Sequence, residues 1–101
     1  MKTFLFFSIF ITSLLYSNTN LDRCENDIQL MMKHSYTAEK ALHNKNYFQA
    51  ENSYNLSIDY SNRALLSCQN LPNYDFNLMY NYIVHSENEI NKINNIQASA
   101  N

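Results

Sequence analysis

The chain has 101 residues, a formal net charge of −2, no glycine, no tryptophan and one proline. This length supports at most a single domain. The lack of glycine argues against folds built on tight hairpins, phosphate-binding loops or dinucleotide fingerprints, because these need positive φ angles or close backbone approach. With so few helix breakers we expect long helices. The slightly negative charge gives no general field for binding nucleic acid.

The first residues have the pattern of a secretory signal peptide. Lys2 is the only charged residue before a mostly apolar run from Phe4 to Tyr16, and polar residues follow at 17–20. An uncleaved membrane anchor is the less favoured alternative, because the apolar run is shorter than the roughly 20 residues that span a bilayer as a helix. We therefore predict a signal peptide over residues 1–19. The protein is expected to be exported, either periplasmic or secreted, with no stable membrane insertion after cleavage.

Residues 21–43 carry the apolar period of a first helix, and Asn20 is the expected N-cap. Apolar and small residues recur at steps of three and four, which places them on one helix face. They are Cys24, Ile28, Met31, Ser35, Ala38 and Leu42. The polar residues 43–46 interrupt this period.

The period restarts in a second predicted helix over residues 47–69. Its apolar face consists of Tyr47, Ala50, Tyr54, Ser57, Ser61, Ala64 and Cys68. Asn46 and Gln49 have the spacing of a capping box, in which each side chain bonds to the backbone of the other. We therefore expect this helix to begin directly after Asn46.

A third period follows the only proline, Pro72, and predicts a helix over residues 73–96. Its apolar face is expected at Phe76, Met79, Ile83, Ser86, Ile90 and Ile93, with Tyr80 beside it. Apolar and polar residues do not alternate over enough positions to indicate strands. We therefore predict an all-α domain over residues 20–97, followed by a disordered tail at 98–101.

The two cysteines test whether the first two helices form an antiparallel hairpin. In such a hairpin, the residue numbers of two residues that lie level with each other always add to the same value, which we call the index sum. It is 92 for a turn centred on Asn46. Cys24 and Cys68 have this sum, as do the pairs Ile28–Ala64, Met31–Ser61, Ser35–Ser57, Ala38–Tyr54 and Leu42–Ala50. Because an even number of cysteines in an exported chain indicates disulfides, we predict a Cys24–Cys68 bridge. Redox sensing and pairing with another chain are the alternatives. The predicted fold is this hairpin plus a third helix, a small three-helix bundle.

No motif in the sequence predicts catalysis. His34, His43 and His85 do not have the i, i+4 spacing of a helical metal site, and no pair of carboxylates indicates an acid–base site. We therefore expect a protein that is not an enzyme and that has no metal and no cofactor. A small enzyme with a dispersed site is the least favoured alternative. The sequon at Asn55 lies within a predicted helix, so glycosylation is not expected.

Tyrosine is the most informative residue type for function. Tyr47, Tyr54 and Tyr80 lie on or beside the predicted core faces and are expected to pack there, as is Phe76. Four tyrosines lie off these faces and are the candidate partner-binding residues, namely Tyr36, Tyr60, Tyr74 and Tyr82. Exposed tyrosine contributes contact area at little entropic cost, which suits a protein-binding face. The alternative is that these side chains have no binding role.

Residues 38–57 resemble the helical hairpin of the tetratricopeptide family. Ala38 stands where the first helix of that repeat has a small residue. Tyr47, Ala50 and Tyr54 match the aromatic–small–aromatic pattern of its second helix. The resemblance implies a tetratricopeptide-like scaffold for protein interactions, without catalysis.

These observations favour an exported, non-catalytic helical module that binds protein partners in the cell envelope, as an accessory subunit or an adaptor. A secreted inhibitor or effector is the alternative. Binding to nucleic acid is not expected, because the net charge is negative. Self-association is left open, since three helices with wide apolar faces can also pack on a second copy.

Overall fold

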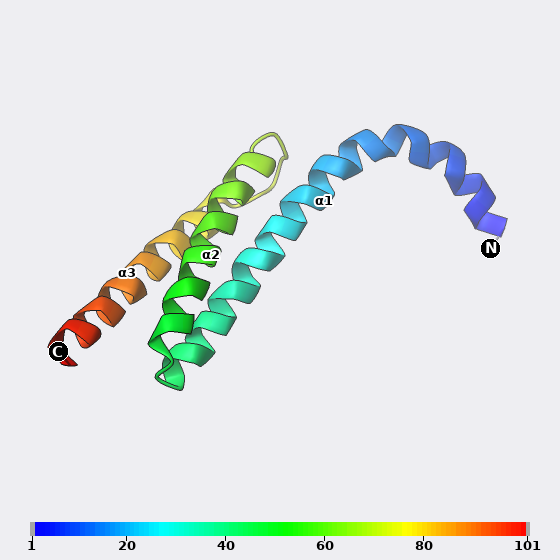
Figure 1. The fold of residues 1–101 in the computed structure, drawn as a ribbon. Coiled ribbons are helices and arrows are strands. Elements are labelled where there is room, and N and C mark those ends of the chain that lie inside the picture. The colour runs from blue at the N-terminus through cyan, green and yellow to red at the C-terminus, as the bar shows by residue number, and fades with distance from the viewer. Residues whose placement is uncertain (1, 101) are drawn as a thin grey trace.

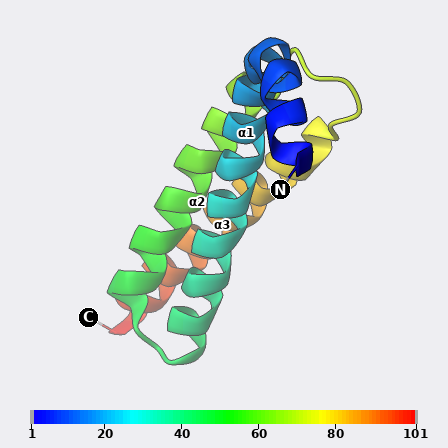
Figure 2. The same ribbon diagram turned by 90° about the vertical axis from the view of Figure 1, so that its right-hand side faces the viewer.

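A computed structural model describes residues 2–100, with side chains for residues 21–100. It contains three helices, α1 (Lys2–His43), α2 (Tyr47–Ser67) and α3 (Phe76–Ala100). α2 lies in the middle, with α1 on one side and α3 on the other, and direct contact between α1 and α3 is limited (Figure 1). Viewed from the side of α1, α3 lies behind the hairpin of α1 and α2 (Figure 2). Since no strand occurs in residues 2–100, the predicted all-α fold is confirmed.

The turn between α1 and α2 is built without glycine. Lys45 adopts the left-handed conformation, with φ 61°. The amide of Asn46 donates to the carbonyl of Ala41 at 2.8 Å, and the amide of Lys45 donates to Leu42 at 3.0 Å. These two bonds are those of a Schellman motif, which satisfies carbonyls left free at a helix end. The reversal at residues 44–46 is therefore fixed by backbone hydrogen bonds.

The predicted capping box at the start of α2 is present in part. The side-chain oxygen of Asn46 accepts a hydrogen bond from the amide of Gln49 at 3.3 Å, and its Nδ2 donates to Gln49 Oε1 at 3.0 Å. Asn46 thus satisfies one of the free amides of the first turn. The glutamine bonds to the asparagine side chain, whereas a full capping box would use the backbone amide.

The register predicted for the hairpin is confirmed. Cys24 and Cys68 form a disulfide with a Cα–Cα distance of 4.9 Å. All other residues of the predicted rungs are buried or half-buried. The core has one cluster near the disulfide, consisting of Cys24, Met31, Ala64, Cys68 and Met79, and one near the turn, consisting of Ala38, Ala41, Ala50, Tyr54 and Ile93. Each cluster joins residues from both arms of the hairpin, as the constant index sum requires.

The predicted apolar face of α3 is also the face that packs. Met79, Ser86 and Ile93 are buried at steps of seven residues, and the other predicted positions on this face are half-buried. Met79 belongs to the disulfide cluster and Ile93 to the turn cluster. α3 therefore runs antiparallel to α2 and extends the core along its whole length.

Tyr80 corrects one expectation about the core. Its side chain is 54% exposed, although we expected it to pack beside the apolar face of α3. Phe76, one turn earlier, is half-buried against the disulfide cluster. Tyr80 lies one position further round the helix from Met79, on the exposed side of α3.

The helix starts and ends differ from those predicted. α1 continues upstream of residue 21, so Asn20 lies within the helix and is not an N-cap. Residues 2–43 contain no glycine or proline, so no helix-breaking residue separates the predicted first helix from the residues before it. The signal peptide predicted over residues 1–19 stays a prediction. Within the described residues, no helix is both long and apolar enough to cross a membrane.

The ends of α2 and α3 also shift. α2 ends at Ser67, and α3 begins at Phe76 where residue 73 was predicted. Asn73 has a φ of 69°, and the Asp75 carboxylate accepts a hydrogen bond from the amide of Asn77 at 3.0 Å. This contact favours a helix start after Asp75.

The tail predicted to be disordered at 98–101 is helical as far as Ala100, and residue 101 lies outside the described residues. Residues 97–100 contain no proline or glycine, and two of the four are alanines. Alanine has the highest helix propensity, so the helix continues.

Loss of the disulfide should destabilise the hairpin strongly. The bridge closes a loop with a sequence separation of 44 residues, for which chain entropy corresponds to about 4 kcal/mol. We expect replacement of both Cys24 and Cys68 by serine to lower the free energy of urea unfolding by this order. The reference is the oxidised wild type, and equal stability of the two would contradict the entropic role of the bridge.

Candidate functional site

The four candidate tyrosines do not form one exposed face. Tyr36 on α1 is 65% exposed, and the Lys40 ammonium lies 5.4 Å from the centre of its ring. Tyr60, Tyr74 and Tyr82 are half-buried and pack against the disulfide cluster. These three side chains are therefore less exposed than we expected, because they pack against the edge of the core where the helices meet. Partial burial, together with the nearby Glu25 carboxylate, raises the pKa of Tyr74.

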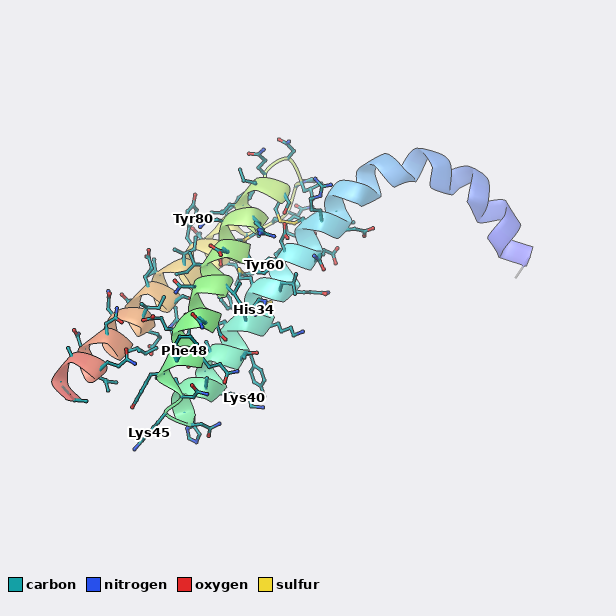
Figure 3. The ribbon with its side chains drawn as sticks, in the orientation of Figure 1. His34, Lys40, Lys45, Phe48, Tyr60 and Tyr80 are labelled. Atoms are coloured by element: carbon teal, nitrogen blue, oxygen red, sulfur yellow. A yellow bond between two sulfur atoms is a disulfide. The ribbon has the colours of Figure 1, made fainter. Side chains whose placement is uncertain are left out.

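Tyr60 is held between residues of both arms of the hairpin. The ring of His34 on α1 stacks on Tyr60, with centroids 5.4 Å apart and an interplanar angle of 16°. The Arg63 guanidinium lies 4.9 Å from the centre of the Tyr60 ring. Figure 3 shows His34 and Tyr60 together where α1 and α2 meet. These contacts restrict the rotamers of all three side chains, and the arginine gains a cation–π contact.

A pocket lies beside this stack, on the same seam between α1 and α2. It has a volume of about 470 Å³ and is lined by Arg23, Asp27, Arg63, Leu66 and Ser67. We call it the α1–α2 pocket. Arg63 belongs to both the pocket and the tyrosine stack, so the two form one continuous surface. Leu66 is 68% exposed and adds an apolar side chain at the edge of the pocket.

The aspartate and the two arginines that line the α1–α2 pocket differ in their burial and in their partners. The Asp27 side chain is only 8% exposed, and its Oδ2 accepts a hydrogen bond from the Ser67 hydroxyl at 2.8 Å. The ion pairs among residues 21–100 are His85–Glu39 and Lys92–Glu89. Arg23 and Arg63 are in neither pair and so have no direct carboxylate partner within this range.

A second hollow, the α1–α3 groove, lies where the limited contact between these two helices leaves space. It has a volume of about 340 Å³ and is lined by Ser35, Glu39, Asn81, Tyr82 and His85. His85 Nε2 and Glu39 Oε1 are 2.5 Å apart and join α3 to α1 across the groove. Both side chains are about half exposed, so the pair adds little stability.

Tyr54 is fully buried close to this ion pair. Its ring meets that of His85 edge-on, with centroids 6.0 Å apart and an angle of 76°. The Tyr54 hydroxyl makes no hydrogen bond of full geometry within the described part of the chain, although the Glu39 carboxylate is close enough to act on it. Burial raises the pKa of Tyr54 most, followed by the Glu39 carboxylate, as an acceptor and as a negative charge, and then by the charge of Glu89. The phenol is therefore neutral at physiological pH.

The three histidines differ in their surroundings. His43 is exposed, and the other two histidines are engaged with Tyr60 and Glu39. Among the described residues, no three His, Cys, Asp or Glu side chains are grouped so that they could hold a metal ion. The sequon serine, Ser57, is fully buried and donates to the carbonyl of Met31 at 3.0 Å.

The sequence analysis missed the residues of the α1–α2 pocket. Arg23 and Asp27 come from α1, and Arg63 and Ser67 come from α2. A signal was present, because Asp27 and Ser67 have an index sum of 94, two away from that of the disulfide. Polar side chains next to the predicted rungs were not paired in the same way as the apolar ones.

The unpartnered hydroxyl of Tyr54 should reduce stability. Leaving a buried hydroxyl without a hydrogen bond costs about 1–3 kcal/mol. We therefore expect Tyr54→Phe to raise the free energy of unfolding by roughly 1 kcal/mol, since the ring and its packing are kept. Tyr47→Phe, at a half-buried position, is the matched control and should change little. A destabilised Tyr54→Phe protein would show that the hydroxyl does bond in solution.

The stability of the protein should decrease in mild acid because of His34. Burial, and then the charge of Lys33, lower the pKa of His34 from 6.5. The unfolded chain takes up a proton near pH 6.5, whereas the folded chain does so only at lower pH. Stability from the neutral ring is therefore fully present above this range and is lost as the pH falls through the lowered value. Urea unfolding of His34→Gln at several pH values should show a shallower dependence on pH than wild type.

His43→Gln changes an exposed histidine and is the control for that titration. It should keep the pH dependence of the wild-type protein. If His34→Gln and wild type had the same slope, the assignment of the pH dependence to His34 would be wrong.

Neither the models of protein families, nor the curated proteins, nor the solved structures include a match to this chain. The tetratricopeptide-like resemblance of residues 38–57 therefore stays a prediction. A function for this chain is argued from the geometry and chemistry of its surfaces, because a helical fold alone is compatible with many functions.

Proposed function

We propose that the protein is an exported, non-catalytic helical module that binds a protein partner in the cell envelope. The observation that carries this proposal is the continuous surface formed by the Tyr60 stack and the α1–α2 pocket. It combines a held tyrosine, two arginines that form no ion pair within residues 21–100, and the exposed Leu66. Tyrosine and arginine are enriched among the residues that dominate binding energy at protein interfaces.

The rigidity of this surface also supports a binding role. Tyr60 and Arg63 lie on α2, and His34 and Arg23 lie on α1, so the surface depends on the register of the hairpin. The disulfide fixes that register at the end of the hairpin nearest to the pocket. Side chains that are ordered before binding lose less entropy when a partner docks.

An accessory subunit or adaptor fits the presence of two separate hollows. The α1–α2 pocket and the α1–α3 groove are lined by different residues of α1. Export is supported by the disulfide, since such bonds persist in oxidising compartments, and by the predicted signal peptide. We propose the α1–α2 surface as the main contact, because there a stacked tyrosine and an exposed leucine lie together with two arginines that form no ion pair within residues 21–100.

Site-specific crosslinking tests this proposal. We place a photo-crosslinking amino acid at Leu66, on the pocket edge, or at Leu78, an exposed leucine of α3, and irradiate intact cells that produce the full-length chain. We expect a discrete adduct of the exported protein with Leu66 and none with Leu78. The mass of the adduct identifies the partner, and an adduct of twice the protein's own mass would identify a second copy.

Two outcomes would contradict the proposed function. Equal labelling at Leu66 and Leu78 would indicate contacts without a defined surface. The absence of any adduct at Leu66, with the protein folded and exported, would show that the α1–α2 surface has no stable partner.

A further inference from the structure

We infer that the α1–α2 pocket binds a carboxylate group, presented by an acidic segment of the partner protein. This inference rests on the proposed function and specifies the chemistry of the partner. It is carried by the juxtaposition of Arg23 from α1 and Arg63 from α2 on one pocket of about 470 Å³. Neither arginine belongs to an ion pair of residues 21–100. Arginine presents a planar fork of donors that matches a carboxylate in bidentate geometry.

Arg63 is positioned in advance for such a contact. Its guanidinium lies 4.9 Å from the centre of the Tyr60 ring, and that ring is itself stacked on His34. Stacking on an aromatic face leaves the edge of the guanidinium, with its N–H groups, free to donate hydrogen bonds. The side chain therefore loses less freedom on binding than an unsupported arginine would.

Asp27 sets the balance of charge in the pocket. It is the one carboxylate among the lining residues, it is nearly buried, and its Oδ2 is bonded to the Ser67 hydroxyl. Two arginines and one aspartate give the lining a formal charge of +1. A single carboxylate neutralises this charge, whereas a phosphate dianion would leave excess negative charge beside a buried aspartate. The balance therefore favours a glutamate or aspartate side chain over a phosphate group.

The surroundings of the pocket define the partner further. Leu66, on its edge, is 68% exposed and offers an apolar contact to the residue next to the bound carboxylate. The whole chain has a net charge of −2, so its general field repels acidic peptides. An acidic segment is then retained by the local arginines, and its acidic residue should be next to an apolar one.

Peptide binding to the purified, oxidised protein tests the inference. The probe is a fluorescein-labelled peptide of alternating glutamate and leucine with both ends blocked, and its glutamine counterpart is the neutral control. We expect fluorescence anisotropy to show binding of the glutamate peptide, weakened by added salt, and none of the glutamine peptide. Arg23→Gln and Arg63→Gln should each weaken binding about tenfold, the loss of one charge-assisted hydrogen bond.

Lys92→Gln is the matched control variant. It also removes one positive charge, but from α3, where Lys92 pairs with Glu89. We expect its affinity for the glutamate peptide to be within a factor of two of wild type. Circular dichroism and thermal unfolding of each variant show whether the fold is kept, so a loss of binding can be assigned to the arginines.

Several results would overturn the carboxylate assignment. Equal binding of the glutamate and glutamine peptides would exclude charge recognition, and equal losses in all three variants would indicate a non-specific attraction. Arginine-dependent binding to vesicles of phosphatidylglycerol, without peptide binding, would assign the pocket to a membrane surface. A Leu66 adduct without peptide binding would remove this inference and keep the proposed function. Peptide binding without any Leu66 adduct would keep the carboxylate specificity of the pocket and contradict the stable protein partner on which the proposed function depends.

Discussion

The register of the α1–α2 hairpin is the constraint on which the rest of the molecule depends. Large and small side chains alternate across the seam, so that Met31 packs near Ala64 in one cluster and Tyr54 packs near Ala38 in the other. A slip of one helical turn would place large residues against large ones and separate the two sulfur atoms. The Schellman turn at Lys45 fixes the reversal at one end and the Cys24–Cys68 bridge fixes it at the other. With both ends fixed, one arrangement of the seam is allowed.

The two hollows of the surface also depend on this register. The α1–α2 pocket combines residues that are 40 positions apart in sequence, as Asp27 and Ser67 are. The α1–α3 groove exists because α3 packs mainly along α2 and has only limited contact with α1. Changes in the packing of α2 would therefore alter both surfaces, although α2 contributes no lining residue to the groove.

Helix periodicity predicted the parts of this structure that repeat along the chain. The core faces and the rungs could be found because a helix returns to the same face every three or four residues and because an antiparallel pair has a constant index sum. The ends of the helices were predicted less well, since they depend on local contacts such as that of Asp75 with Asn77. The burial of Tyr60 and Tyr82 could not be predicted, because it depends on how closely a neighbouring helix approaches the edge of the core. The numbering of Asp27 and Ser67 indicated the polar seam of the pocket, but that its two arginines form no ion pair within residues 21–100 is seen only when the surrounding side chains are placed.

Five serine hydroxyl groups lie on the buried faces of the three helices. Ser35, Ser53, Ser57, Ser61 and Ser86 are all buried, and two of them donate to carbonyl groups of the helix backbone, Ser57 to Met31 and Ser61 to Ser57. Small hydroxyl side chains let helices approach closely, but they remove less apolar area from water than leucine or isoleucine would. The hydrophobic effect therefore contributes less to the stability of this fold, and the Cys24–Cys68 disulfide contributes a larger part of it. In such a chain the packing of small side chains holds the two arms together only weakly, so the covalent link has a large share in keeping them in register.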